Sequence, residues 1–372
     1  MKTLYKLFTD ILKEKEKWQY YKNMNIEDNL DKIFNNPTKF ICDYLQNSGK
    51  LTNELENNIG KLSDNRCKHT ISIFFLGLLF YHYISELELH IYHSINSAKV
   101  DINKSNIDLQ FNYWWFLICL IHDIGYSYND NQGSVELFGK KKHKEILFEI
   151  EENLNSILRD SSASVPEKII NNWKKYLDYK PRKNIKDKKK EKIDHGILAG
   201  AYYIYSISKL YEKKKSGKTL DENFGFYDNN QLYWSQTMLD YFHKPIAWII
   251  TAHNIWYKNR NCENTEDYEK ELKNLIIDKP IVCLKKYPLY FLLSLVDTLD
   301  PVKYIQQLES NVVTILKNTQ LCLSHNTIEI KFVDELIKYN KGYNRKTSDI
   351  GCWMDIETDL NLKNLLEKKN ES

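Results

Sequence analysis

The sequence predicts a mostly α-helical protein. Hydrophobic residues make up 42% of the 372 residues and aromatic residues 13%, which is enough apolar surface for a sizeable core. The chain has only 12 Gly and 7 Pro, fewer than the many turns of an all-β sandwich would need. Long segments are apolar almost all round, as expected for helices buried in a larger helical core.

Charge and cysteine content exclude several other classes. The 53 basic and 50 acidic residues nearly cancel, so the net charge gives little attraction to nucleic acid or anionic membranes. The seven cysteines are scattered and form no C-x-x-C pair, which argues against a disulfide framework and a zinc ribbon. No apolar run reaches the length of a membrane span, and residues 1–21 lack the apolar stretch of a signal peptide. We therefore expect a cytoplasmic protein with no membrane contact.

The first half of the chain predicts helices in order. Residues 1–60 form an N-terminal helical segment, whose apolar positions from Leu4 to Leu12 are spaced by three and four as in an amphipathic helix. A buried helix is expected from Cys67 to about Ile95, and another over 111–124. The second ends at Gly125, the residue type that most readily adopts the left-handed conformation closing a helix.

The second half begins with a polar insertion at about 127–192, whose lysine-rich end at 180–192 predicts a flexible loop. Helices are expected again over 194–210, 245–256 and 287–308. After Asn311, the short runs VVTIL, QLCL and TIEIKF favour a small β-hairpin or three-stranded element. The expected domains are therefore residues 1–60, a main helical domain at 61–310 that contains the insertion, and a small β-containing appendage at 311–372.

The apolar helices share one chemical feature, because each of several carries a His or Asp among apolar neighbours. These residues are His69, His122, Asp123, His195, His253 and Asp297. A carboxylate in an apolar helix is costly unless it is paired or bound to a cation. Imidazole and carboxylate together suit one or two Mn, Fe, Ni, Co or Zn ions, with Mg also open, and the absence of cysteine at these points excludes a structural thiolate site.

The order His, His-Asp, His, His, Asp resembles the HD superfamily of metal-dependent phosphohydrolases over about residues 66–308, with the insertion excluded. Arg66 stands three residues before His69 as in the R-x-x-H opening of the family, HDIG reproduces its central signature, and LVDTLDP is similar to its closing segment. The resemblance implies an HD-type helical bundle. It also implies that His69, His122, Asp123 and Asp297 hold a first metal ion. His195 and His253 would hold a second ion, with Asp123 bridging the two.

The resemblance implies hydrolysis of a phosphomonoester, phosphodiester or phosphoanhydride bond in a nucleotide or nucleic acid. A metal-bridging hydroxide would attack phosphorus, and Asp123 would orient it. Arg66 and Lys303 are candidates to neutralise the remaining phosphate charge, although each could equally form a surface or helix-end ion pair.

Two departures from the pattern of the HD superfamily narrow the choice among its subclasses. Tyr126 follows HDIG where many cyclic-dinucleotide phosphodiesterases of the superfamily have Lys, so that subclass is disfavoured. Residues 194–204 resemble a segment of the nuclease domain attached to type I CRISPR helicases. That nuclease domain, however, typically has two adjacent histidines where this chain has His253-Asn254, and no helicase motif follows.

Two classes of function stay open from the sequence. The first is an active phosphohydrolase whose partner is a phosphate-containing small molecule or single-stranded nucleic acid, which the lysine run could attract if it is more than a solvated loop. The second is a non-catalytic, metal-stabilised HD sensor or partner-binding module. Retention of all six candidate ligands favours the enzyme, and a homo-oligomer or a protein partner stays open.

Overall fold

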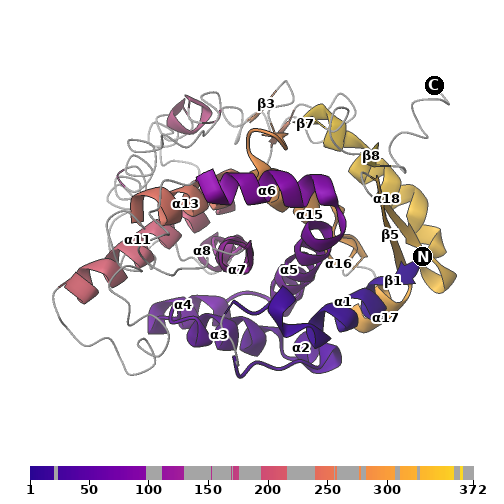
Figure 1. Ribbon diagram of the computed structural model, residues 1–372, viewed down its shortest axis with the longest axis horizontal. Helices are drawn as coiled ribbons and strands as arrows, with labels where there is room; N and C mark the ends of the chain where they lie inside the picture. The colour runs from indigo at the N-terminus through magenta and orange to yellow at the C-terminus, as the bar shows by residue number, and fades with distance from the viewer. Residues whose placement is uncertain are drawn as a thin grey trace, which may run out of the picture.

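The computed structural model is mostly α-helical, as the composition predicts (Figure 1). The structure describes residues 1–20, 24–97, 111–129, 152, 169, 171–175, 194–215, 239–254, 256–257, 276–277, 282–305, 311–324, 327–355 and 361–362. Most of the predicted insertion, including its lysine-rich run at 180–192, lies outside these residues.

The N-terminal 60 residues begin with a short strand and continue as helices. The first helix is amphipathic as predicted, and it buries Leu4, Phe8, Ile11 and Leu12 on one face. The Thr3 hydroxyl caps it by accepting a hydrogen bond from the Lys6 backbone amide at 3.3 Å. The elements of this part are β1 (Lys2–Thr3), α1 (Leu4–Lys13), α2 (Leu30–Asn35), α3 (Pro37–Asn47) and α4 (Asn53–Gly60).

The long apolar segment expected as one helix forms two, α5 (Asp64–Tyr83) and α6 (Ser85–Ser97), which meet at 98°. Ile84 separates them in an extended conformation (φ −115°, ψ 98°), a region that β-branched side chains favour. The prediction of a single helix from Cys67 to Ile95 was therefore wrong at this position. The bend lets both helices bury an apolar face against the same core.

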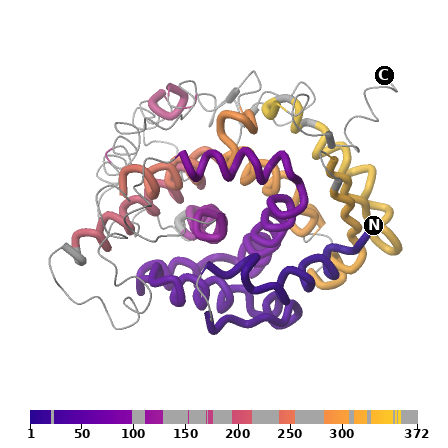
Figure 2. Tube along the Cα trace, viewed as in Figure 1, coloured from indigo at the N-terminus to yellow at the C-terminus, as the bar shows by residue number. Residues whose placement is uncertain are grey.

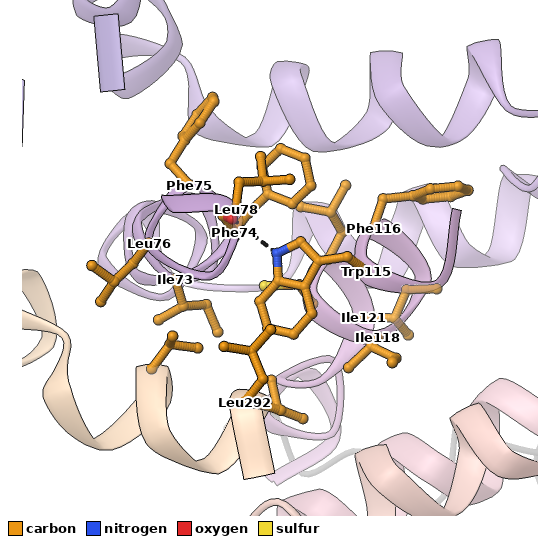
Figure 3. Close-up of a cluster of buried hydrophobic side chains, with 14 of the residues drawn as sticks. Ile73, Phe74, Phe75, Leu76, Leu78, Trp115, Phe116, Ile118, Ile121 and Leu292 are labelled. Atoms are coloured by element: carbon orange, nitrogen blue, oxygen red, sulfur yellow. Dashed lines mark hydrogen bonds between the residues drawn. The ribbon is translucent and has the colours of Figure 1, made fainter. Parts of the chain in front are cut away.

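The next helix, α7 (Phe111–Ile121), is buried along its whole length and is seen end-on near the middle of Figure 1. Trp115 of α7 lies against α5, and its indole nitrogen donates to the Phe74 carbonyl at 2.9 Å (Figure 3). A methyl group on Gly77 would lie 2.0 Å from the Trp115 ring. Only glycine at this position lets the indole ring approach α5 so closely.

The remaining helices of the main domain lie around α7. They are α8 (Tyr126–Asn129), α11 (His195–Lys215), the π-helical turn η7 (Leu239–His243), α13 (Lys244–Ala252), α15 (Pro288–Leu299) and α16 (Pro301–Ile305). Proline stands in the first turn of α13 and α15, where its missing amide hydrogen costs no helical hydrogen bond. The expected helix starts near 194, 245 and 287 are thus confirmed.

The C-terminal region contains the expected hairpin, in which β5 (Thr319–Ser324) pairs antiparallel with β6 (Thr327–Phe332). The sheet also takes in β1 and β8 (Asn361–Leu362), in the order β1-β5-β6-β8. The VVTIL run, expected as a strand, is instead the helix α17 (Val312–Lys317). The Asn311 side chain caps it by accepting from the Thr314 amide, and its buried residues Val312, Ile315 and Leu316 fit helical spacing.

After the hairpin the chain is helical again, through η9 (Asp334–Tyr339), α18 (Asn340–Thr347) and η10 (Ser348–Cys352). It then forms β7 (Met354–Asp355), which pairs in parallel with β4 (Val282–Cys283), while β2 (Trp256–Tyr257) pairs with β3 (Ile276–Ile277). The N-terminal helix α1 lies beside the C-terminal region (Figure 2), since β1 pairs with β5 and α1 contacts α17. The first and last parts of the chain therefore meet.

Within the described ranges, no single helix has both the length and the apolar character needed to cross a membrane, although the bent pair α5 and α6 meets these criteria when taken together. Both helices of that pair bury side chains in the core. The cysteines that the structure describes are free thiols, as their scattered spacing predicts; they are Cys42, Cys67, Cys119, Cys283 and Cys322.

Candidate metal centre

The predicted ligands come from five helices or from the residues at their ends. His69 lies in the second turn of α5, and His122 and Asp123 directly follow α7. His195 begins α11, His253 ends α13, and Asp297 lies in the last turn of α15. Helix ends supply most of these side chains because the helices converge there, which brings residues far apart in sequence together.

Asp123 lies at the centre of the cluster. Its Oδ1 atom is 3.4 Å from His122 Nε2, 3.5 Å from His195 Nε2 and 3.7 Å from His253 Nε2. Its Oδ2 atom is 3.9 Å from His69 Nε2. These five residues form two groups that could hold a metal ion, namely His69 with His122 and Asp123, and His195 with His253 and Asp123. Asp123 is shared by both.

Backbone carbonyls fix the orientation of two imidazoles. His122 Nδ1 donates to the Cys119 carbonyl at 2.7 Å, and His253 Nδ1 donates to the Ile250 carbonyl at 2.6 Å. A proton held at Nδ1 leaves Nε2 with its lone pair, which in both residues points toward Asp123. This is the tautomer in which histidine binds a metal ion while its other nitrogen is held by the protein.

His69 is held by a carboxylate that the sequence reasoning did not single out. Its Nδ1 lies 2.7 Å from Asp300 Oδ2, and Ser72 Oγ donates to the other oxygen of Asp300 at 2.6 Å. Asp300 also accepts from the backbone amide of Lys303 at 2.8 Å, so it caps α16. The signal that could have revealed it is an aspartate directly before a proline at a helix start.

Two buried polar atoms in the cluster lack a hydrogen-bond partner among the residues that the structure describes. They are His122 Nε2 and Asp123 Oδ2. In addition, His195 Nε2 and His253 Nε2 are only 3.2 Å apart, so two imidazole nitrogens face each other. Buried polar atoms without partners are costly, and the two facing nitrogens of His195 and His253 can share only one proton between them. A cation between them would satisfy these atoms, so the residues fit the expected metal ion.

Asp297 lies at the edge of the cluster and belongs to neither three-residue group. One of its oxygens is 2.9 Å from His69 Nε2, and Lys303 donates to both oxygens at 2.7 and 2.8 Å. The structure thus brings Asp297 and Lys303 to the site as expected, but pairs them with each other. That Asp297 binds metal stays a prediction.

Arg66 also reaches the cluster, and it does so through Tyr126. Its guanidinium lies 3.4 Å above the Tyr126 ring, which in turn stacks on the His195 ring at 4.0 Å. Arg66 Nη1 is 3.5 Å from Asp123 Oδ2. Tyr126, the residue directly after HDIG, is therefore a ring held between a cation and a candidate ligand.

The role expected for Gly125 was wrong, because its backbone is not left-handed and α7 ends four residues earlier. A methyl group at this position would lie 1.9 Å from the His195 carbonyl oxygen. Glycine is needed here for the close approach of two backbones. This contact places His195 beside Asp123.

Burial and neighbouring charges set the protonation of the histidines. Burial lowers the pKa of His122 to about 4 and that of His195 well below its usual value. Both rings are therefore neutral at pH 7, the form that binds metal. Burial alone would lower the pKa of His69 too, but hydrogen bonds to Asp297 and Asp300 outweigh it and raise the pKa to about 8.

A pocket of about 170 Å³ opens beside the cluster. Its lining includes His253 and Asp297 of the cluster and a wall of C-terminal residues that contains Lys346 and Trp353. This wall was not expected, since the sequence reasoning treated residues 311–372 as an appendage. The arrangement offers a compact space next to candidate metal ligands and two lysines, Lys303 and Lys346.

Comparison with known proteins adds no relative: no family model, no curated protein and no solved structure matches the chain. Membership of the HD superfamily stays a prediction from the sequence motifs. The structure itself shows a buried cluster of histidines around Asp123 that could hold a metal ion.

Proposed function

We propose that the chain is an HD-type metal-dependent phosphohydrolase that cleaves a phosphate ester or anhydride bond in a nucleotide or nucleic acid. The observation that carries this proposal is the place of Asp123 in both ligand groups. One three-residue group would be enough for an ion that only stabilises the fold. A second group sharing the same carboxylate fits a two-ion site, which is typical of enzymes that transfer phosphoryl groups.

A divalent transition-metal ion bound here would supply an acidified water and a positive charge for the phosphoryl oxygens. The protein's own part is to place charges. Asp123 Oδ2 has no hydrogen-bond partner among the described residues, so it is free to accept one from the attacking water and orient it. Arg66 is fixed by its stacking on Tyr126, with its guanidinium within reach of a phosphate near Asp123.

In this proposal Lys303 also contributes positive charge to the pocket. It holds both oxygens of Asp297, and its side chain is 36% exposed at the pocket. Asp297 would be one of the residues that hold the ion, and Lys303 beside it would donate to a phosphate oxygen. The charge in the pocket then suits an anionic substrate.

The first test is metal content and metal-dependent hydrolysis. Protein purified without chelator should contain one to two transition-metal ions per chain by elemental analysis. A screen of nucleoside triphosphates, cyclic nucleotides, dinucleoside polyphosphates and single-stranded DNA or RNA, with added Mn²⁺, Ni²⁺ or Mg²⁺, should yield a substrate. Bound metal without hydrolysis of any of them would favour the metal-stabilised sensor or partner-binding module.

Asp123→Asn is the sharpest variant. It should lower hydrolysis at least about a hundredfold, because the neutral amide binds cations poorly and both ligand groups lose a shared member. The fold should survive, since removing a buried charge offsets part of the lost coordination energy. Asp10→Asn, which removes a partly exposed aspartate paired with Lys6 on α1, is the matched control and should leave the rate unchanged. An Asp123→Asn variant as active as the parent would contradict the proposal.

A further inference from the structure

The pocket beside the metal centre has a wall that comes from the C-terminal region. Tyr343, Lys346 and Thr347 of α18 and Trp353 after η10 line the pocket together with His253 and Asp297 of the centre. These residues follow the metal-binding helices by more than 40 positions. No sequence motif indicates that these residues lie at the site.

This wall is anchored firmly to the helices that carry the ligands. The Tyr343 hydroxyl donates to the Leu299 carbonyl at 2.6 Å, at the end of α15. A methyl group on Gly342 would lie 2.2 Å from the Tyr304 hydroxyl, so α18 approaches α16 as closely as a glycine allows. Farther on, the Val282 amide donates to the Trp353 carbonyl at 3.2 Å. The wall is therefore held at both ends in a fixed position.

Two lysines from different parts of the chain share this pocket. Lys303 comes from α16, next to the metal centre, and Lys346 comes from α18. The Lys346 ammonium lies 5.4 Å from the centre of the Tyr304 ring, and no carboxylate in the described part of the chain forms an ion pair with it. Desolvation and repulsion from Lys303 lower the pKa of Lys346, and the Asp297 and Asp300 carboxylates act in the opposite direction. Two lysines that line one pocket offer an anion two ammonium groups, of which only Lys303 is paired with a carboxylate among the described residues.

We propose that Lys346 and Lys303 form a subsite for a second phosphate group, next to the phosphate that is cleaved. The substrate is then a small ester with two linked phosphates, of the nucleoside di- or triphosphate class. This inference rests on the proposed function, because it places the first phosphate at the metal centre. It assigns a substrate-binding role to the C-terminal region, which the metal chemistry alone does not require.

The geometry favours a short phosphate chain over a nucleic acid strand. The pocket volume of about 170 Å³ suits a compact group, and buried Tyr343 and Trp353 are among its lining residues. Site size and charge therefore match a pair of adjacent phosphates bound by two cations. An extended strand needs a groove that follows its backbone.

The test measures binding of non-hydrolysable probes to the Mn²⁺-loaded full chain by calorimetry. Methylenebisphosphonate represents two linked phosphates, and methylphosphonate represents one. Lys346→Gln should weaken methylenebisphosphonate about tenfold, which is the scale of one hydrogen bond to a charged group, and change methylphosphonate less than about twofold. Lys346→Arg keeps the charge and should restore binding to within about threefold.

Arg345→Gln is the matched control, because Arg345 is the neighbouring exposed cation on the same helix and does not line the pocket. It should leave both affinities unchanged. Elemental analysis after each titration shows whether the metal stays bound, and circular dichroism shows whether each variant is folded.

Every outcome bears on the proposal. Selective loss of methylenebisphosphonate in Lys346→Gln, with rescue by arginine, supports it. Equal loss of both probes, an equal effect of Arg345→Gln, or a metal-loaded parent that binds methylenebisphosphonate no better than methylphosphonate overturns the subsite and leaves the proposed function standing. A parent chain that takes up no metal overturns both.

Discussion

At the scale of single residues, Asp300 shows how a group outside the candidate ligand set can orient a candidate ligand. It is 1% exposed, and it forms hydrogen bonds with His69, Ser72 and the start of α16. Its bond to His69 Nδ1 keeps the proton on that nitrogen and presents Nε2 to the cluster. Carboxylates in this position make a histidine a better metal ligand and fix its ring.

Asp300→Asn should therefore weaken metal binding about 10- to 100-fold, the usual cost of losing such a partner. The near-isosteric amide keeps the cap on α16, so the unfolding midpoint of the metal-free chain should change little. The measurement is a competition titration of Mn²⁺ against a chromophoric chelator. Asp43→Asn on α3, where Asp43 pairs with Lys39 far from the cluster, is the control. Equal affinity of Asp300→Asn and the parent would show that Asp300 is only a cap.

A second residue-scale prediction concerns His243, which lies outside the metal centre. It is buried, accepts a hydrogen bond from the Tyr203 hydroxyl at 2.7 Å, and lies near the Tyr211 ring. Burial, with a smaller repulsion from Lys50, lowers the pKa of His243 well below 6.5. The unfolded chain then takes up a proton below about pH 6.5 that the folded chain does not. Stability contributed by this residue is level above that pH and falls as the solution becomes more acidic.

Urea unfolding of the metal-loaded protein at pH 7.5 and pH 5.5 measures this effect. Between these values the parent should lose about 1.4 kcal/mol more free energy of unfolding than His243→Asn, whose amide accepts the same bond but does not titrate. The comparison cancels the contributions of other histidines, because both proteins share them. Parallel losses in parent and variant would mean that His243 takes up its proton equally well in the folded state.

At the scale of elements, the distance between His195 and His253 depends on how closely α11 and α13 pack. A methyl group on Gly200 of α11 would lie 1.8 Å from Thr251 Oγ1 and 2.6 Å from the Ala247 carbonyl of α13. Gly200→Ala must therefore push the helices apart, and overpacking of this kind costs about 1–3 kcal/mol. The free energy of unfolding and the affinity for metal should fall together.

Gly60→Ala provides the comparison, because Gly60 is also a helical glycine, at the end of α4, and nothing lies within 4 Å of the added methyl group. Its stability should stay within about 0.5 kcal/mol of the parent or rise slightly, as alanine is the better helix former. Chemical denaturation of both variants with and without Mn²⁺ gives the two numbers. A Gly200→Ala variant as stable as Gly60→Ala would mean that α11 and α13 are not rigidly packed.

The helices and strands also show which parts of the fold the sequence could predict. Apolar runs correctly placed α5, α7, α11, α13 and α15, because a helix buried on all sides needs apolar residues at every position. The break at Ile84 and the helix of the VVTIL run were missed, since β-branched residues favour extended structure and tertiary packing decides between the two. Gly125 was identified as structurally important for the wrong reason, because the chain that approaches it is 70 residues away.

Some residues of the candidate site were likewise predictable from the sequence, and others were not. His122 and Asp123 were predictable because a His-Asp pair in an apolar helix is costly without a partner. Asp300 and Lys346 were not, since their roles follow from contacts with His69 and Lys303 that only the folded chain creates. Local pattern thus identified ligands, and long-range packing supplied the residues that orient ligands or line the pocket.

At the scale of the whole molecule, the metal centre ties together helices from across the chain. Its five candidate ligands span residues 69 to 253, and the pocket wall adds the C-terminal region. The C-terminal region also contacts the start of the chain, because β1 pairs with β5 of the C-terminal sheet. Helices held at one point by several ligands should separate less easily when that point is occupied by a cation.

Metal removal should therefore lower the stability of the whole chain. An ion that binds only the folded state stabilises it by about 2.7 kcal/mol at a free concentration of 100 times its Kd, and by about 4.1 kcal/mol at 1,000 times. In a chain of 372 residues that corresponds to a rise in Tm of roughly 3–5 °C. Differential scanning calorimetry with chelator and with rising Mn²⁺ measures it, and Tm should increase with the logarithm of Mn²⁺ concentration. Asp123→Asn should show little of this increase, because its two ligand groups are both incomplete. If the Tm of the parent is the same with chelator and with Mn²⁺, then the buried histidine cluster does not hold a metal ion in the folded protein.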